Sequence, residues 1–140
     1  MCQLLGMNSR LPASLNLSFT GFARRGGLTD HHADGWGIAF FESEGEQPGR
    51  GIRHFVDKES AATSPLAHML RSFPIKSHNV IAHVRKATMG AITLENAHPF
   101  VRELWGRYWV FAHNGDLKNY APTLHGNFRP VGDTDSELAF

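Results

Sequence analysis

Residues 1–8 of the chain read MCQLLGMN and place a cysteine directly after the initiator methionine. Initiator methionine is usually removed when the next side chain is small, so we expect Cys2 to become the first residue. Cys2 would then carry a thiol and a free α-amine, whose reference pKa of about 7.7–8.0 suits it as a base for the thiol. The alternative is that Cys2 is a small buried apolar residue, as most lone cysteines are.

The composition describes a globular chain of ordinary charge. The 140 residues fit one domain, and 41% of them are hydrophobic against 19% charged. The 14 Lys and Arg residues nearly balance the 13 Asp and Glu residues, which argues against a nucleic-acid partner. With one cysteine the chain forms no internal disulfide, and it shows no membrane span and no signal peptide. We therefore expect a cytoplasmic protein without a membrane partner.

Apolar periodicity and capping residues predict mixed α and β structure. Strands are expected at 2–7, 36–43, 51–58, 79–87 and 108–115, and helices at 11–27 and 64–74, with a loop over 88–107. Ser64 is the expected N-cap of the second helix and Pro65 its first residue. Thr134 and Glu137 form a capping box that begins a helix close to Phe140. Because so short a helix is unstable alone, we expect residues 1–140 to be the N-terminal fragment of a longer domain.

Two side chains at the ends of apolar runs are candidates for ligand binding. Arg85 follows an expected strand, and its planar guanidinium can hold a carboxylate through two parallel hydrogen bonds. The alternative for Arg85 is a surface charge. His98 lies on a loop that Pro99 keeps extended, and a structural histidine is the alternative there.

A second pair of motifs follows further along the chain. In FAHNGDL, the Asn114 amide donates hydrogen bonds and Gly115 exposes its backbone N–H, which suits an oxyanion hole. The alternative is that Asn-Gly forms a tight hairpin turn. In DTDSE, Asp135 either pairs with an ammonium group or is an acidic residue favoured in a first helical turn.

The histidine-rich stretch DHHAD raises the question of a metal. His31, His32 and Asp34 lack the spacing of the usual helical and finger-type zinc sites, and no second cysteine is available. DGWG lacks the phosphate-loop pattern. We therefore expect neither a metal nor another cofactor.

Taken together and in this order, these stretches resemble the glutaminase domain of class II glutamine amidotransferases. The matching segments are MCQLLGMN, RRGG with HHADGWGIAFF, AHVRKATMG, ENAHPF, FAHNG and TDSE. The nearest resemblance is to stand-alone bacterial amidotransferases without a fused synthase domain. Two features differ from the family's usual pattern: Lys86 replaces an aromatic residue, and the loop before DGWG is longer.

The resemblance implies an α+β N-terminal-nucleophile hydrolase fold, with two antiparallel sheets stacked between helix layers in an αββα sandwich. It implies that Cys2 is the nucleophile and that Asn114 and Gly115 form the oxyanion hole. Arg85 would hold the substrate α-carboxylate and Asp135 the α-ammonium, with Thr88 and His98 lining the pocket. Arg25 and Asp34 would support the turn of the nucleophile.

The resemblance also implies the reaction. The Cys2 thiolate would attack the side-chain amide of glutamine, ammonia would leave, and water would hydrolyse the γ-glutamyl thioester. Two alternatives stay open: hydrolysis of a γ-glutamyl conjugate by the same mechanism, and a catalytically inactive binding or regulatory module. Beyond the small-molecule substrate, an acceptor enzyme and a second copy of the chain are the candidate partners.

Overall fold

The computed structural model describes residues 2–29, 31–44 and 47–140. The strands are β1 (Gln3–Ser14), β2 (Trp36–Glu44), β3 (Gln47–Asp57), β4 (Lys76–Val84), β5 (Phe100–Leu104) and β6 (Arg107–Phe111). The helices are α1 (Asn16–Arg24), α2 (Pro65–Ser72), α3 (Asp135–Ala139) and a short 3₁₀ helix, η1 (Leu94–Asn96). Among the described residues, no helix is both long enough and apolar enough to cross a membrane.

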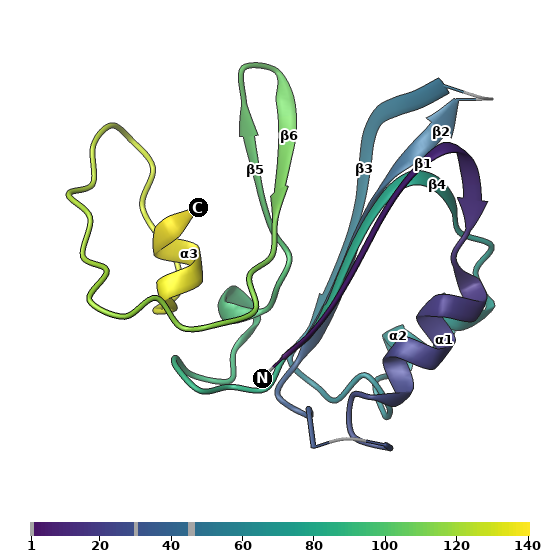
Figure 1. Cartoon of the computed structure of the whole chain (residues 1–140), viewed down its shortest axis with the longest axis horizontal. Helices are drawn as coiled ribbons and strands as arrows, with labels where there is room; N and C mark the ends of the chain where they lie inside the picture. The colour runs from purple at the N-terminus through teal and green to yellow at the C-terminus, as the bar shows by residue number, and fades with distance from the viewer. Residues whose placement is uncertain (1, 30, 45–46) are drawn as a thin grey trace.

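The strands form two antiparallel sheets. The larger has the order β1-β4-β2-β3, and the smaller is the hairpin of β5 and β6. In Figure 1, α1 and α2 cover one side of the larger sheet, the hairpin stands on its other side, and α3 lies beyond the hairpin. This order of helices, sheet, sheet and helix confirms the α+β class with antiparallel sheets expected from the sequence.

The main core fills the space between the larger sheet and the helices α1 and α2. Phe19 of α1 packs on Trp36 of β2, with ring centroids 5.8 Å apart. Both side chains are fully buried, as are the other large members of this cluster: Leu15, Ile38, Leu70, Ile75, Val80 and Val84. Burial of this apolar face fixes the strand ends, from which the loops of the candidate site extend.

The capping residues predict the helix starts well. The Ser64 side chain accepts a hydrogen bond from the Ala67 N–H, and Pro65 opens α2. The Thr134 hydroxyl accepts from the Glu137 N–H at 3.2 Å. Helix α1 begins at Asn16 rather than at residue 11, because β1 continues to Ser14 along its partner β4.

The prediction of a loop over residues 88–107 is wrong in its second half. Phe100–Leu104 forms β5, which pairs with β6 through a two-residue turn at Trp105 and Gly106. Both turn residues have positive φ, 58° and 68°, as type I′ turns require. The strand is only five residues long and contains Arg102 and Glu103, so its own sequence gives little β signal.

Candidate functional site

The thiol of Cys2 lies where β1 begins, beside the end of β4. The Lys86 backbone N–H points at the Cys2 sulfur, 3.3 Å away, and the thiol is 3.4 Å from the Lys86 carbonyl oxygen. Cys2 is half-buried. The antiparallel pairing of β1 with β4, which matches Gln3 to Val84, brings the start of the chain to this position.

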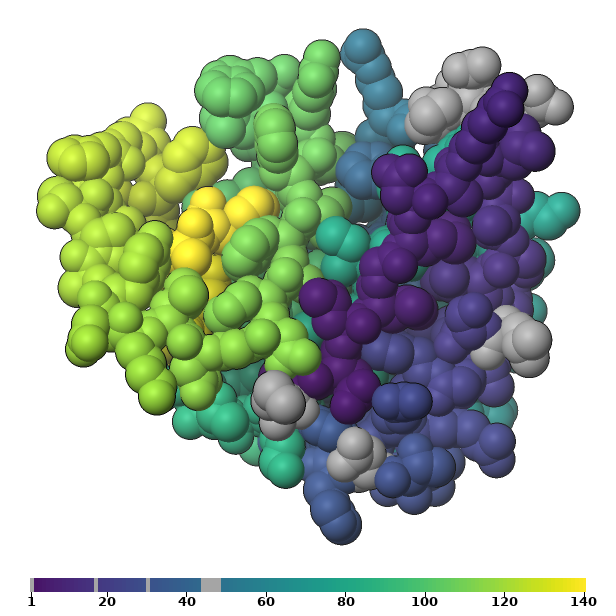
Figure 2. Space-filling model, viewed as in Figure 1, coloured from purple at the N-terminus to yellow at the C-terminus, as the bar shows by residue number. Residues whose placement is uncertain are grey.

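Asn114 contacts Cys2, although the two residues are far apart in the sequence. Its side-chain amide donates to the Cys2 carbonyl oxygen at 2.8 Å, although the two residues are 112 positions apart in the sequence. Figure 2 shows the purple start of the chain in contact with the green segment that follows β6. Asn114 and Gly115 lie beyond the end of β6 and are exposed, and no strand follows them in the described chain. The hairpin-turn alternative for Asn-Gly is therefore wrong.

Asp34 and Arg25 support the two segments that flank the thiol. The Asp34 carboxylate accepts the Ala87 N–H at 2.8 Å, and the Asp34 N–H donates to the Arg85 carbonyl oxygen at 3.2 Å. The Arg25 guanidinium donates to the side-chain carbonyl of Gln3 at 3.2 Å. These contacts hold the residues next to Cys2 and Lys86, and the supporting role that the resemblance implies for Arg25 and Asp34 stays a prediction.

The guanidinium of Arg85 is buried and holds the loop that follows it. It donates to the carbonyl oxygens of Ala91 and Met89, both at 2.8 Å, and of Gly90 at 3.3 Å. Arg85 is 3% exposed, so the surface-charge alternative is wrong. The structure thus shows a buried cation at the strand end whose donors are shared with a loop.

His98 is buried against β2 and β4. A side chain at Gly37 would collide with the His98 carbonyl oxygen, so glycine there permits this close approach. The ring of His98 lies 4.4 Å from that of His83, centroid to centroid, and the His98–Pro99 peptide bond is cis. Burial lowers the pKa of His98 to about 4, helped by the charges of Arg85 and His113 and opposed by Asp135. His98 is therefore a neutral group at pH 7, within electrostatic reach of Arg85 and Asp135.

Thr88 and Asp135 contact the segment that carries Asn114. The Thr88 hydroxyl donates to the Asp116 carboxylate at 2.9 Å. One oxygen of Asp135 accepts the Leu117 N–H at 2.6 Å, and the other accepts the Ser136 N–H at 2.8 Å. The carboxylate of Asp135 is thus fixed by two backbone donors and stays available for a further partner through its remaining lone pairs.

Sequence reasoning missed two polar residues of this region, His113 and Ser136. The His113 Nδ1 and the Ser136 hydroxyl are 3.0 Å apart and link the segment after β6 to α3. Each lies next to a predicted site residue, Asn114 and Asp135 respectively. That adjacency was the only available signal, because neither residue belongs to a chemical pattern of its own.

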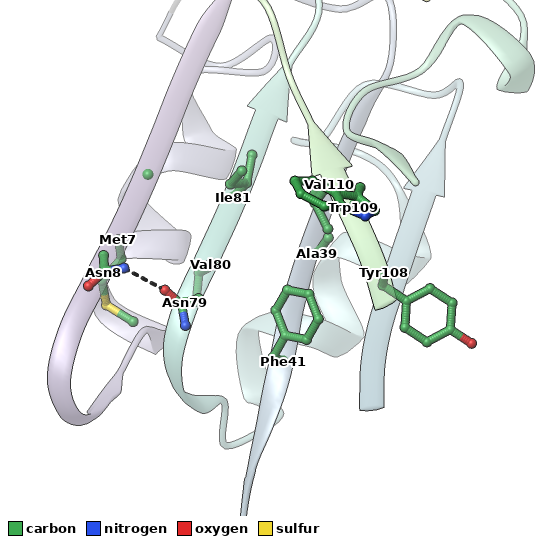
Figure 3. A pocket seen from close by; sticks show the side chains of 11 residues that line it. Met7, Asn8, Ala39, Phe41, Asn79, Val80, Ile81, Tyr108, Trp109 and Val110 are labelled. Atoms are coloured by element: carbon green, nitrogen blue, oxygen red, sulfur yellow. Dashed lines mark hydrogen bonds between the residues drawn. The ribbon is translucent and has the colours of Figure 1, made fainter. Parts of the chain in front are cut away.

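A separate cavity lies away from Cys2. A cavity of about 530 Å³ opens between the larger sheet and β6, and its walls are mostly apolar (Figure 3). Its two amide side chains, Asn8 and Asn79, bond to each other at 2.8 Å. Tyr108 is its only titratable lining residue. Because no nucleophile or charged side chain enters it, we place the candidate site at Cys2 instead.

In the part of the chain that the structure describes, no three His, Cys, Asp or Glu side chains converge as metal ligands. Asp34, the last residue of the DHHAD stretch, accepts the Ala87 N–H. What the site does offer is a thiol with an amide donor at its side, a buried guanidinium, and an acceptor carboxylate. This set can attack a carbonyl carbon, stabilise an oxyanion and bind a zwitterionic end group.

Comparison with known proteins gives one consistent result. The family model "Glutamine amidotransferases class-II" matches residues 1–140. A "Putative glutamine amidotransferase" of Haemophilus influenzae is 56% identical over 140 residues, which is 100% of this chain and 46% of that protein. The "Putative glutamine amidotransferase YafJ" of Escherichia coli is 52% identical over 140 residues, covering 100% of this chain and 52% of the relative.

A solved structure agrees with these relatives. The crystal structure of a "predicted glutamine amidotransferase" from Pseudomonas aeruginosa has a TM-score of 0.65 and 48% identity, and the match covers 99% of this chain and 52% of that one. The chain thus spans about half the length of these proteins.

Proposed function

The chain belongs to the class II glutamine amidotransferases, and we propose that its site hydrolyses the side-chain amide of glutamine through a γ-glutamyl thioester on Cys2. The observation that carries the proposal is the contact between Asn114 and Cys2, which are 112 positions apart in the sequence. A nucleophile and a hydrogen-bond donor for the developing oxyanion must lie side by side for this reaction.

The proposed first half-reaction forms the thioester. Once Met1 is removed, the α-amine of Cys2 takes the thiol proton, directly or through a water molecule, and the sulfur attacks the amide carbon. The carbonyl oxygen gains negative charge, which the Asn114 amide and the Gly115 N–H stabilise. The C–N bond breaks, the amine returns the proton to the leaving nitrogen, and ammonia departs.

The second half-reaction restores the enzyme. A water molecule, deprotonated by the same amine, attacks the thioester carbon, and the C–S bond breaks to release glutamate and the Cys2 thiol. Arg85 and Asp135 would hold the α-carboxylate and the α-ammonium during both steps. To accept the carboxylate, Arg85 must share or exchange its bonds to the carbonyl oxygens of Met89, Gly90 and Ala91.

A γ-glutamyl conjugate is the second candidate substrate, and one observation favours it. Lys86 and the loop after it are exposed, with Met89 at 56% and Ile92 at 51%. The Lys86 backbone lies against the Cys2 sulfur, so an exposed residue adjoins the thiol. A leaving amine larger than ammonia therefore fits the same mechanism.

The test is the release of ammonia and glutamate by the protein with Cys2 at its N-terminus, over a panel of glutamine, asparagine and γ-glutamyl amides. We expect turnover of a γ-glutamyl substrate, labelling of Cys2 by a diazo-ketone analogue of glutamine, and loss of both in Cys2→Ser. Ser64→Ala, which changes a buried serine in the N-cap of α2, is the control that keeps Cys2. Labelling at the full rate in Cys2→Ser, or no turnover across the panel, would overturn the proposal and favour an inactive binding module.

A further inference from the structure

Residues 113–117, which we call the oxyanion turn, carry Asn114 and Gly115 but belong to no sheet. Strand β6 ends at Phe111, so the ladder between β5 and β6 does not reach them. Hydrogen bonds that involve side chains hold the turn instead. Asn114 donates to the Cys2 carbonyl oxygen, the Thr88 hydroxyl donates to Asp116, and the start of α3 supplies further contacts. The position of the turn therefore depends on side-chain hydrogen bonds.

The first contact from α3 is made by Asp135. Its Oδ2 accepts the Leu117 N–H at 2.6 Å, and its Oδ1 accepts the Ser136 N–H at 2.8 Å. The carboxylate proposed to bind the substrate α-ammonium is thus also an anchor of the oxyanion turn. A displacement of this carboxylate changes the bond to Leu117, two residues beyond Gly115.

The second contact is made by Ser136, which is 4% exposed. Its hydroxyl lies 3.0 Å from the His113 Nδ1 and 3.4 Å from the Asp135 Oδ1. His113 immediately precedes Asn114. Asp135 and Ser136 thus bond to the turn on both sides of the Asn-Gly pair. The Ser136 hydroxyl, which is near both His113 and Asp135, connects these two contacts.

We propose that His113 and Ser136 are positioning residues that couple recognition of the substrate α-ammonium at Asp135 to the placement of the Asn114–Gly115 oxyanion hole. The inference rests on the proposed function and deepens it. An ammonium bound at Asp135 fixes the position of the carboxylate, and the carboxylate fixes the position of the Leu117 N–H. The bond between Ser136 and His113 transmits this constraint to the other side of the turn. A substrate without the α-amine should then have a lower kcat as well as a higher KM.

The first arm of the experiment needs no variant. The protein with Cys2 at its N-terminus is assayed with glutamine and with glutaramic acid, which is glutamine without the α-amine. Since misplacing a catalytic group by about 1 Å can reduce a rate by about 100-fold, we expect kcat for glutaramic acid to be at least about 10-fold lower. A kcat equal to that for glutamine, with only KM raised, would overturn the coupling.

The second arm uses Ser136→Ala, Ser136→Thr and Ser77→Ala, with kcat expressed per Cys2 labelled by the diazo-ketone analogue. We expect Ser136→Ala to lower kcat for glutamine by about 10-fold with KM within about twofold, and Ser136→Thr, which keeps the hydroxyl, to restore most of it. Ser77 is a matched control because its buried hydroxyl bonds the Phe41 carbonyl oxygen away from the site. Ser77→Ala should lower thermal stability and leave kcat unchanged.

The outcomes separate the two proposals. If the unaltered protein turns over glutamine while Ser136→Ala keeps full kcat, the coupling is wrong and the proposed function stands. The coupling is equally wrong if Ser77→Ala reduces kcat as much as Ser136→Ala does, because the loss then reflects general stability. Absence of turnover in the unaltered protein overturns the proposed function, and the coupling with it.

Discussion

Arg85 and Asn114 each hold backbone carbonyl oxygens in the structure, in addition to the chemical roles that we propose for them. The Arg85 guanidinium holds three carbonyl oxygens of residues 89–91, and the Asn114 amide holds the Cys2 carbonyl oxygen. Each also has N–H donors beyond those used in these bonds. In the proposed mechanism, these contacts preorganise both groups and so reduce the reorganisation that substrate binding and reaction require.

Asn114 gives the prediction that belongs to the residue scale. Asn114→Asp keeps the shape of the side chain but replaces its N–H donor with an acceptor that repels an oxyanion. We expect kcat for glutamine to fall by about 10²–10³ with a small change in KM, measured by ammonia release. Asn127→Asp, on the exposed loop before α3, is the control for the added charge. Full activity of a folded Asn114→Asp variant would exclude the amide from the oxyanion hole.

The sequence predicts the site residues that belong to motifs, but not those whose parts depend on contacts between distant loops. Motif patterns point to Cys2, Arg85, Asn114 and Asp135, and the structure links Cys2 to Asn114 directly and Asp135 to the oxyanion turn. They do not reveal Ser136 or Leu117, whose parts depend on which loops meet in space. The catalytic roles of all of these residues stay predictions, because geometry alone does not test turnover.

At the scale of elements, the helix starts can be predicted from local residues, whereas the strands that depend on distant partners cannot. Ser64, Pro65 and Thr134 act within one helical turn, so the starts of α2 and α3 can be predicted from the sequence. The length of β1 and the existence of β5 depend on partner strands, which no local pattern contains. Tertiary pairing extends β1 to Ser14 across residues that the apolar pattern assigns to a helix.

The contact between β4 and the segment after η1 leads to a prediction on pH. His83 of β4 is fully buried; burial, followed by the charge of His98, lowers its pKa to about 3, although the nearby His113 backbone acts in the opposite direction. The pKa of His98 is lowered to about 4. In the unfolded chain both histidines titrate near their ordinary pKa of about 6.5, so between there and pH 4 the unfolded state binds more protons. Stability is therefore lost as the pH falls through this window.

The expected size follows from linkage: each histidine reduces the free energy of unfolding by about 2 kcal/mol between pH 7 and pH 5. His83→Gln, which is neutral throughout, should lose about half of this pH dependence in urea denaturation at the two pH values. His125→Gln, on an exposed loop, should keep all of it. An equal loss of stability in His83→Gln and the unaltered chain would show that the buried pair does not control the acid response.

On the scale of the whole molecule, the described residues leave a large apolar surface uncovered. Trp105 is 80% exposed and Val131 83%, and the walls of the cavity between the larger sheet and β6 are mostly apolar. Exposed patches of this kind mark surfaces that pack against other protein. The relatives that the chain matches are about twice its length.

The position of the N-terminus yields a prediction that involves the entire chain. In Figure 1 the chain begins where the larger sheet meets the half of the molecule that contains β5, β6 and α3. Cys2 there contacts Lys86 from one side and Asn114 from the other. Any residue attached to the amine of Cys2 converts the proposed base into an amide, which cannot accept the thiol proton, and adds bulk between these segments.

We therefore expect an uncleaved N-terminal extension to abolish glutamine hydrolysis, and proteolysis that leaves Cys2 first to restore it. The same extension placed after the last residue is the control, since it leaves the amine free. Intact mass should show the mature protein lacking Met1, and ammonia release should rise in proportion to the fraction processed. The comparison tests the free N-terminus of Cys2, its amine and the space around it together, because thiol, donor and fold are the same before and after cleavage. Equal turnover with the extension in place would mean that a group other than the α-amine deprotonates Cys2.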